Sequence, residues 1–310
     1  MLETIALRAR RAGRLLWAPG LRSHQAAAGV GRLTLLTAGL VACAAACGPS
    51  YADDPSLQDV SQKPAAFDGP PTTIMGRWIP DADKAAHLSW AGTQLRTRFK
   101  GTAITASLAF KGPKPETYLG VIVDDGEPTR LAVTPDKTQY VIDGLTPGEH
   151  SLTLVKLNEG MDGELAFQGF TPTEGALLPT ARPTGRRIEF IGDSITCGYG
   201  NEGVITTAML VNSTDEAAKG GRSCKKFLGK DTYEVSNAYL SWAAQAATAL
   251  KAEYHLICWS GKGVYRNADG STDDLVPELW DRAVESDAAS RWDPAGWVPQ
   301  VVVINLGTND

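Results

Sequence analysis

The chain has 310 residues, of which 43% are hydrophobic and 21% are charged, a composition typical of a globular protein with room for two domains. Its formal net charge of −5 argues against a nucleic-acid partner, because no basic surface would offset the repulsion of phosphates. After residue 50 the sequence has no apolar run long enough to span a bilayer and no repeat of fixed period.

Residues 1–47 have the pattern of an export signal. Several arginines precede a short apolar run over residues 33–42, which is the order of regions in a signal peptide. The run ends in Leu40-Val41-Ala42-Cys43, which resembles a bacterial lipoprotein box, so Cys43 is the expected lipidation site; Cys47 offers a second register. An ordinary signal peptide cleaved near Ala52 is the alternative, and the long leading segment also allows a start codon later than the first one. In each case we expect an exported protein, either a membrane-anchored lipoprotein or a secreted or periplasmic one, with membrane contact only through a lipid anchor.

Residues 73–178 are expected to fold as a β module, after a Ser-, Asp- and Pro-containing linker over residues 48–72. Short runs alternate apolar and polar residues, and glycines such as Gly92 and Gly101 separate them. Many short strands at even spacing favour a β-sandwich or jelly roll. The expected strands cover residues 86–90, 94–99, 103–108, 118–123, 129–133, 140–142, 151–156 and 165–170.

The aromatic and histidine side chains of this module have two interpretations each. Trp78, Trp90 and Tyr118 suit stacking on sugar rings, but a place in the core is the favoured prediction. His87 and His150 lie within strand patterns, which favours structural roles over catalytic ones.

Residues 186–310 alternate strands and helices after a Pro-rich junction at 178–185. This alternation predicts an α/β domain with a doubly wound parallel sheet. The Ala-rich helix is expected to begin after an N-cap at Ser236 or Asn237 and to bury one face. The expected strands cover residues 188–191, 253–259 and 301–306, the last of them buried. The expected helices cover 237–250, with Leu240, Ala243, Ala247 and Leu250 on one face, and 275–283.

Three of these strands end in polar, Gly-containing loops that carry Ser194, Gly261 and Asn309. The carboxyl ends of parallel strands share one edge of a sheet, where ligands bind. Acyl transfer needs a nucleophile and donors that stabilise an oxyanion. Ser194 suits the nucleophile, while the N–H groups of Ser194 and Gly261 and the side-chain amide of Asn309 suit the donors. Each signal is weak alone, and the three together favour a hydrolase.

These blocks resemble those of the SGNH (GDSL-type) hydrolase superfamily: Gly192-Asp193-Ser194, Gly261 and Gly307-Thr308-Asn309-Asp310. More narrowly, residues 73–310 resemble carbohydrate esterase family 2, in which a jelly roll precedes a flavodoxin-like SGNH domain. The resemblance implies removal of acetyl groups from xylan, glucomannan and their oligosaccharides, without a metal or cofactor. It implies Ser194 as nucleophile, Ser194, Gly261 and Asn309 as oxyanion hole, and Tyr265 as an aromatic that faces the sugar.

The superfamily takes its general base from a histidine well beyond the Gly-x-Asn-Asp block, and this sequence ends on that block. His24 lies in the expected signal and His255 near the start of a strand, so neither suits the role. We therefore expect a truncated copy whose SGNH domain is incomplete at the C-terminus, and little or no activity from these 310 residues alone.

Three cysteines follow the signal: Cys197, Cys224 and Cys258. In an exported protein an odd number leaves at most one bridge and one free thiol. We favour Cys197–Cys224, because Cys258 lies in an apolar strand and suits a buried small hydrophobic residue. No Cys/His spacing resembles a zinc site.

Two alternatives to a polysaccharide esterase remain open. One is an SGNH lipase or thioesterase, which the β module and the lack of an apolar lid sequence disfavour. The other is a catalytically incompetent, carbohydrate-binding lipoprotein, in which the SGNH domain holds glycans without turnover.

Overall fold

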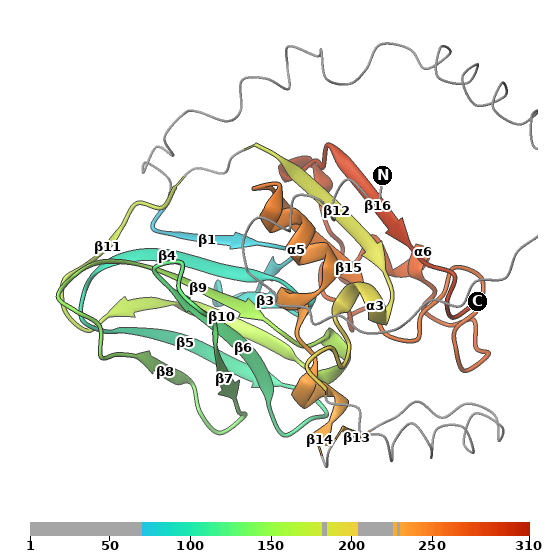
Figure 1. The fold of residues 1–310 in the computed structure, drawn as a ribbon, viewed down its shortest axis with the longest axis horizontal. Helices are drawn as coiled ribbons and strands as arrows, with labels where there is room; N and C mark the ends of the chain where they lie inside the picture. Colours follow the sequence, from blue (N-terminus) through green and yellow to red (C-terminus); the bar gives the residue numbers. More distant parts are fainter. Residues whose placement is uncertain (1–69, 182–184, 204–225, 228–229) are drawn as a thin grey trace, which may run out of the picture. The chain divides into compact units, whose positions relative to one another are not determined.

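A computed structural model describes residues 70–181, 185–203, 226–227 and 230–310 (Figure 1). The expected signal, the lipidation site Cys43, most of the linker and Cys224 lie outside the described residues. The described residues belong to one compact unit, Val60–Asp310. Within them, no helix has the length and apolar character needed to cross a membrane.

Two antiparallel sheets form the first part of this unit. The eight expected strands are all present, with β3 ending at Leu88, two residues early. One sheet has the order β1 (Thr72–Met75), β4 (Gln94–Gly101), β9 (Gly148–Lys156), β6 (Thr117–Val123) and β7 (Thr129–Val133), with β11 (Ala176–Leu178) on β4. The other has the order β2 (Ile79–Pro80), β3 (Ala86–Leu88), β10 (Glu164–Pro172), β5 (Ile104–Lys111) and β8 (Gln139–Ile142).

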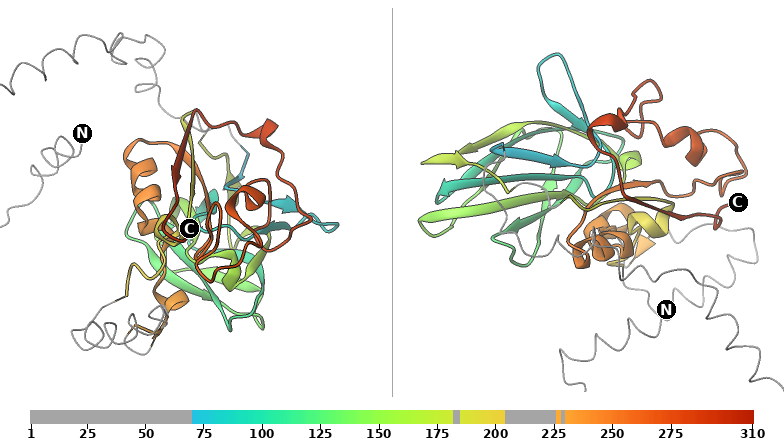
Figure 2. Two further views of the ribbon diagram at one scale, coloured as in Figure 1. Left: turned by 90° about the vertical axis from the view of Figure 1, so that its right-hand side faces the viewer. Right: turned by 90° about the horizontal axis from the view of Figure 1, so that it is seen from above.

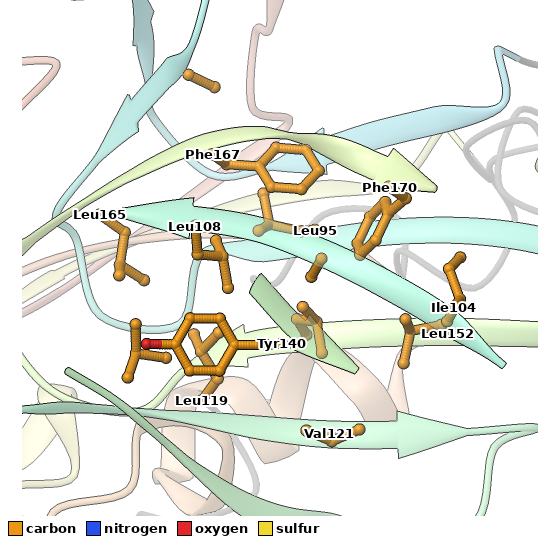
Figure 3. Packing of buried hydrophobic residues seen from close by; sticks show 14 of the residues in the cluster. Leu95, Ile104, Leu108, Leu119, Val121, Tyr140, Leu152, Leu165, Phe167 and Phe170 are labelled. Carbon is orange, nitrogen blue, oxygen red and sulfur yellow. The ribbon is translucent and has the colours of Figure 1, made fainter. Parts of the chain in front are cut away.

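The core of this part follows from the period of two in its strands. Along β5 every second side chain is buried, because successive side chains point to opposite faces of a sheet. Each large side chain that is fully buried contributes about 1.5–3 kcal/mol. Figure 3 shows members of this cluster, with Leu95 and Leu152 from one sheet and Ile104, Leu108, Tyr140 and Phe167 from the other.

Trp90 belongs to a different cluster, in which it packs with Ile257 and Leu279. It is 1% exposed, so the prediction that it is a core residue is confirmed. Trp78 packs against the core of the antiparallel sheets, and Tyr118 is partly buried in a further small cluster.

The second part contains three parallel strands in the order β15 (Glu253–Cys258), β12 (Arg187–Gly192) and β16 (Val301–Asn305). β12 is central, and Gly192 is aligned with both Cys258 and Asn305. The prediction that 301–306 is buried is wrong. Within the described residues β16 pairs only with β12, and Val301, Val302 and Ile304 are at least half exposed.

Both expected helices differ from the prediction. The Ala-rich segment divides into a 3-10 turn, η5 (Ala238–Leu240), and the helix α5 (Trp242–Ala249), because Asn237 caps the first and Ser241 caps the second. The buried residues of α5 are Ala243, Ala244 and Ala247, whereas Leu240 and Leu250 are exposed. The helix expected over 275–283 is one turn long, α6 (Val276–Leu279).

A buried ion pair connects the antiparallel strands to the parallel ones. The guanidinium of Arg77, which follows β1, donates to the carboxylate of Glu189 in β12 at 2.8 Å. The indole N–H of Trp280 donates to the other oxygen of that carboxylate at 3.0 Å. Burial lowers the pKa of Arg77, while Glu189 opposes the shift by stabilising the charged guanidinium.

Candidate active site

Ser194 lies at the carboxyl end of the central strand β12, as the first residue of the short helix α3 (Ser194–Cys197). The carboxylate of Asp193 caps this helix by accepting the N–H of Ile195 at 3.0 Å. Gly192 is required, because a Cβ there would lie 2.0 Å from Oγ1 of Thr196. The Gly-Asp-Ser sequence therefore forms a tight strand-to-helix turn on which Ser194 is partly exposed.

A disulfide joins Cys197 at the end of α3 to Cys258 at the end of β15, with the two Cα atoms 5.5 Å apart. The expected pairing of Cys197 with Cys224 is thus wrong. Cys258 is aligned with Gly192 on the neighbouring strand, and the single turn of α3 returns Cys197 to that position. The bond connects the Ser194 turn to the strand that leads to Gly261.

Gly261 lies in the loop after β15, in the left-handed region with φ of +81°. No atom lies within 4 Å of the position that a Cβ would occupy. Its carbonyl accepts the N–H of Ala268 at 2.9 Å. Among the described residues, no acceptor is hydrogen-bonded to its own N–H. The backbone conformation at Gly261 therefore favours glycine, and in the described part of the chain no acceptor competes for its N–H.

The loop after β16 packs against the Gly261 loop (Figure 2, where C marks the end of the chain). The side-chain amide of Asn309 donates to the carbonyl of Lys262 at 2.8 Å. The carboxylate of Asp310 accepts the N–H groups of Val264, Tyr265 and Arg266, at 3.2, 2.5 and 3.1 Å. These backbone donors lower the pKa of Asp310. Asp310 thus anchors the Gly261 loop, a role that the sequence did not indicate.

A second carboxylate holds the same loop from the antiparallel part of the unit. Glu159 accepts the N–H of Ser260 at 2.6 Å and also contacts the Ser260 hydroxyl. Burial raises the pKa of Glu159 to about 7, against the opposing effect of the Ser260 hydrogen bonds. Sequence reasoning missed this residue, since no motif links it to Ser260 across 101 positions.

The predicted active-site residues lie at the carboxyl edge of the parallel sheet. Ser194, Gly261 and Asn309 follow the aligned residues Gly192, Cys258 and Asn305 by two, three and four positions, respectively. Tyr265, in the same edge region, is 80% exposed. Their roles as nucleophile, oxyanion donors and sugar contact stay predictions.

The three histidines of the described residues have other partners. His87 contacts Asp81 and Glu164; burial lowers its pKa, but these carboxylates outweigh burial and raise it. His150 contacts Asp124 at 2.6 Å, which raises its pKa. His255 is aligned with Glu189 in the sheet, which places it three residues, or about 10 Å along the strand, before the strand ends at Gly192 and Cys258.

His255 is also buried in an aromatic environment. Its ring stacks on Trp297 with centroids 3.5 Å apart, and its Nδ1 has no hydrogen-bond partner in the described part of the chain. Burial lowers its pKa well below the usual value, and the charges of Arg77 and Arg187 act in the same direction. The contacts of these three histidines are thus with residues outside the Ser194 turn. Among the described residues, no cluster of metal-ligating side chains is present.

Residues 74–181 match the family model of the carbohydrate esterase 2 N-terminal domain. The structure also resembles a solved active-site mutant of a family two carbohydrate esterase from Clostridium thermocellum. The TM-score is 0.65 at 33% sequence identity, covering 78% of this chain and 67% of that one. This chain belongs to carbohydrate esterase family 2.

Curated relatives are similar at the sequence level. The cellulase/esterase CelE of Acetivibrio thermocellus is 34% identical over 244 residues, and an acetylxylan esterase/glucomannan deacetylase of Cellvibrio japonicus is 33% identical over 224 residues. The chain spans 27% of the length of the first relative and 55% of the second. A further solved family two esterase from Clostridium thermocellum, 34% identical with a TM-score of 0.65, is in complex with cellohexaose; the match covers 77% of this chain and 66% of that one.

Proposed function

We propose that this protein removes O-acetyl groups from plant polysaccharides or oligosaccharides of the xylan or glucomannan type, through an acyl-serine intermediate. The observation that carries the proposal is the Ser194 turn, which is linked by the Cys197–Cys258 disulfide to the strand that leads to Gly261. The N–H of Gly261, which has no acceptor among the described residues, is suited to a negatively charged oxygen beside that serine. The curated relatives with acetylxylan esterase and glucomannan deacetylase activities support the substrate class.

In the proposed reaction the Ser194 oxygen attacks the acetyl carbonyl carbon, and the carbonyl oxygen becomes an oxyanion. The N–H groups of Ser194 and Gly261 and the amide of Asn309 stabilise that charge, which exists only in the intermediate and its flanking transition states. The sugar hydroxyl leaves with the proton taken from Ser194, and water then hydrolyses the acetyl-serine to acetate. The general base would be a histidine other than His87, His150 and His255, since each of these has partners elsewhere.

Asn309 has to serve two partners in this scheme. Its amide already donates one hydrogen to the carbonyl of Lys262 at 2.8 Å. An amide nitrogen carries two hydrogens, so the second is free for the oxyanion while the first fixes the side chain. We also propose that the antiparallel part is the jelly-roll module of the family, and that residues 186–310 form its SGNH-type, flavodoxin-like domain.

A second candidate function is glycan binding without turnover. It is favoured by Tyr265, whose 80% exposed ring at the site edge suits stacking on a sugar face. The solved relative that holds cellohexaose points to the same ligand class for that protein. A lipid or thioester substrate has no comparable support among the described residues.

The test measures acetate release from acetylated xylan and acetylated glucomannan by the protein as its own cell produces it. The proposal predicts release from at least one of these polymers and faster hydrolysis of aryl acetate than of aryl esters with longer acyl chains. Calorimetric titration with cello- and xylo-oligosaccharides is run in parallel. Binding without acetate release would favour the glycan-binding function, and a preference for long acyl chains would favour a lipase.

We further propose that the protein is exported, with Cys43 as the lipidated residue of a bacterial lipoprotein signal. The support is the order of basic, apolar and Leu-Val-Ala-Cys segments in residues 1–43. Export agrees with a polymeric substrate, which is outside the cell.

A further inference from the structure

We infer that Glu159 is a positioning residue of the active site, which holds the Gly261 loop in place from the antiparallel part of the unit. The inference rests on the proposed esterase function and deepens it, because it adds a residue that lies outside the three loops of the catalytic edge. Glu159 follows β9 and precedes the 3-10 turn η3 (Gly160–Asp162).

A single carboxylate accepts hydrogen bonds from both donors of Ser260, its N–H and its hydroxyl. The N–H of Ser260 donates to one oxygen of Glu159 at 2.6 Å, and the Ser260 hydroxyl contacts the other oxygen. The side chain of Glu159 reaches this position from the protein interior, since the residue is 2% exposed. Ser260 is therefore fixed through its backbone and its side chain at once.

Ser260 immediately precedes Gly261, and the peptide bond between them carries the N–H that the proposed mechanism uses. The direction of that N–H depends on how Ser260 is held on one side and Gly261 on the other. Glu159 supplies the first constraint, and the 2.9 Å hydrogen bond from Ala268 N–H to the Gly261 carbonyl supplies the second. Donors that are oriented before the reaction stabilise an oxyanion without reorganising during it.

Glu159 is itself held in place by buried neighbours. The ammonium of Lys156 donates to the carbonyls of Asn158 and Glu159 at 2.7 and 2.9 Å. The carboxylate of Glu285 accepts the N–H groups of Gly160 and Met161 at 2.7 and 3.2 Å. A Cβ at Gly160 would approach a Glu285 oxygen to 2.5 Å, so the chain passes close to this carboxylate. The segment that carries Glu159 is thus hydrogen-bonded on both sides of this residue.

The charged groups that face Glu159 are Lys156, Asp162 and Glu285. Burial raises the pKa of the carboxyl groups of Glu159, Asp162 and Glu285, and the positive charge of Lys156 partly offsets this. The Glu159 carboxyl group can accept the N–H of Ser260 in either protonation state. When it is protonated, its O–H can also donate to the Ser260 hydroxyl. Glutamine has nearly the same shape, and its amide can likewise accept the Ser260 N–H and donate to the Ser260 hydroxyl. The positioning role therefore predicts that Glu159→Gln keeps the loop in place and that Glu159→Ala does not.

The test compares Glu159→Ala, Glu159→Gln and the matched control Glu189→Ala in the protein as its cell produces it. Glu189 is also a buried carboxylate, but it contacts Arg77 and Trp280 and not the Gly261 loop. We expect Glu159→Ala to lower kcat on an aryl acetate about 10- to 100-fold, because a misplaced oxyanion donor acts on the transition state. KM should change by less than about threefold. Glu159→Gln should stay within about threefold of the wild type in both constants.

The control should lower the melting temperature and leave kcat near the wild-type value. A kcat for Glu159→Ala equal to that of Glu189→Ala would overturn the inference, as would an equal loss in Glu159→Gln. If Glu159→Ala does not fold, Ser260→Ala takes its place, because it removes only the hydroxyl contact. We expect it to lower kcat about 3- to 10-fold; an unchanged kcat overturns the inference.

Amide hydrogen exchange at Ser260, whose N–H donates to Glu159, provides a readout that needs no turnover. Exchange at this amide should be faster in Glu159→Ala and unchanged in Glu189→Ala. Unchanged exchange in Glu159→Ala would overturn the inference even if the wild type releases acetate rapidly. Conversely, a wild type that releases no acetate defeats the proposed esterase function, while the exchange data still decide whether Glu159 holds the loop.

Discussion

Cys197 and Cys258 form a disulfide that joins the helix starting at Ser194 to the strand ending just before Ser260 and Gly261. The bond spans 61 residues of sequence, and most of that length is the segment between the first and second parallel strands. It therefore fixes the loops that carry Ser194 and Gly261, two of the three loops of the candidate site, relative to each other.

Removing this bond by the double substitution Cys197→Ala/Cys258→Ala should destabilise the protein. Crosslinks of this loop length contribute about 2–4 kcal/mol, chiefly by restricting the unfolded chain. Denaturant unfolding of the variant and the wild type, both under non-reducing conditions, measures the difference. Addition of a reductant should shift the wild type towards the variant and leave the variant unchanged. Equal midpoints for the two proteins would show that the bond is absent or energetically silent.

Gly261→Ala tests the second loop, with Gly270→Ala as its control. Both glycines have positive φ, +81° and +85°, and neither has an atom within 4 Å of a Cβ position. Alanine at either site should therefore be destabilising by a similar amount, about 1–2 kcal/mol. Only Gly261→Ala should lower kcat, by about 100-fold, because its methyl group and shifted N–H disturb the oxyanion site.

Steady-state kinetics on an aryl acetate and thermal unfolding of both variants make this comparison. If the two variants lose activity equally, backbone strain alone explains the effect, and Gly261 has no special place in the chemistry.

The raised pKa of Glu159 leads us to expect that the free energy of unfolding depends on pH through this residue. Its pKa is about 7 in the folded protein against an ordinary 4.5, so the native state binds this proton more tightly than the unfolded chain does. The resulting stabilisation is fully present below about pH 4.5 and is lost as pH rises to about 7. Its size is on the order of 3 kcal/mol, from about 1.4 kcal/mol per pKa unit.

Glu159→Gln removes this titration. Unfolding free energies of the wild type and the variant, measured by urea at pH 4.5 and 7.5, should therefore differ in their pH dependence, with the wild type losing more stability on going to pH 7.5. Contributions from His87 and His150 cancel in this comparison because both proteins contain them. Parallel curves for the two proteins would mean that Glu159 titrates normally.

Lipidation at Cys43 predicts a change in location upon Cys43→Ala. The wild type should sediment with bacterial membranes and be released by detergent, because an acylated N-terminus partitions into the bilayer. The variant should appear in the soluble periplasmic or culture fraction, or as an unprocessed precursor. Membrane association that survives this substitution would exclude Cys43 as the anchor and direct attention to Cys47.

The strand patterns predicted most of the fold because their physical cause is local. Alternation of apolar and polar residues in 104–108 reflects burial of one face, and the structure has that burial in β5. The Gly-Asp-Ser turn was recognisable for a similar reason, because Gly192 and Asp193 meet steric and capping needs within four residues. Structural features that depend on residues close in sequence can therefore be predicted from the sequence.

Contacts between residues far apart in the sequence could not be predicted in the same way. The pairing of Cys197 with Cys258 depends on strand register, which the spacing of cysteines does not encode. The contact of Glu159 with Ser260 joins two separate parts of the unit, across 101 residues. The Ala-rich segment was predicted to be one helix because helix propensity is summed over a window of residues. In the structure Ser241 caps a separate helix within that segment.

The most direct test of the account is acetate release by wild type and Ser194→Ala, each purified as the cell produces it, from acetylated xylan and acetylated glucomannan. Oligosaccharide binding and thermal unfolding of both proteins show whether the substitution leaves the fold intact. We predict release by the wild type, loss of at least about 1,000-fold in Ser194→Ala, and unchanged binding and melting temperature. Acetate release by Ser194→Ala at a rate near that of the wild type would contradict the assignment of Ser194 as the nucleophile.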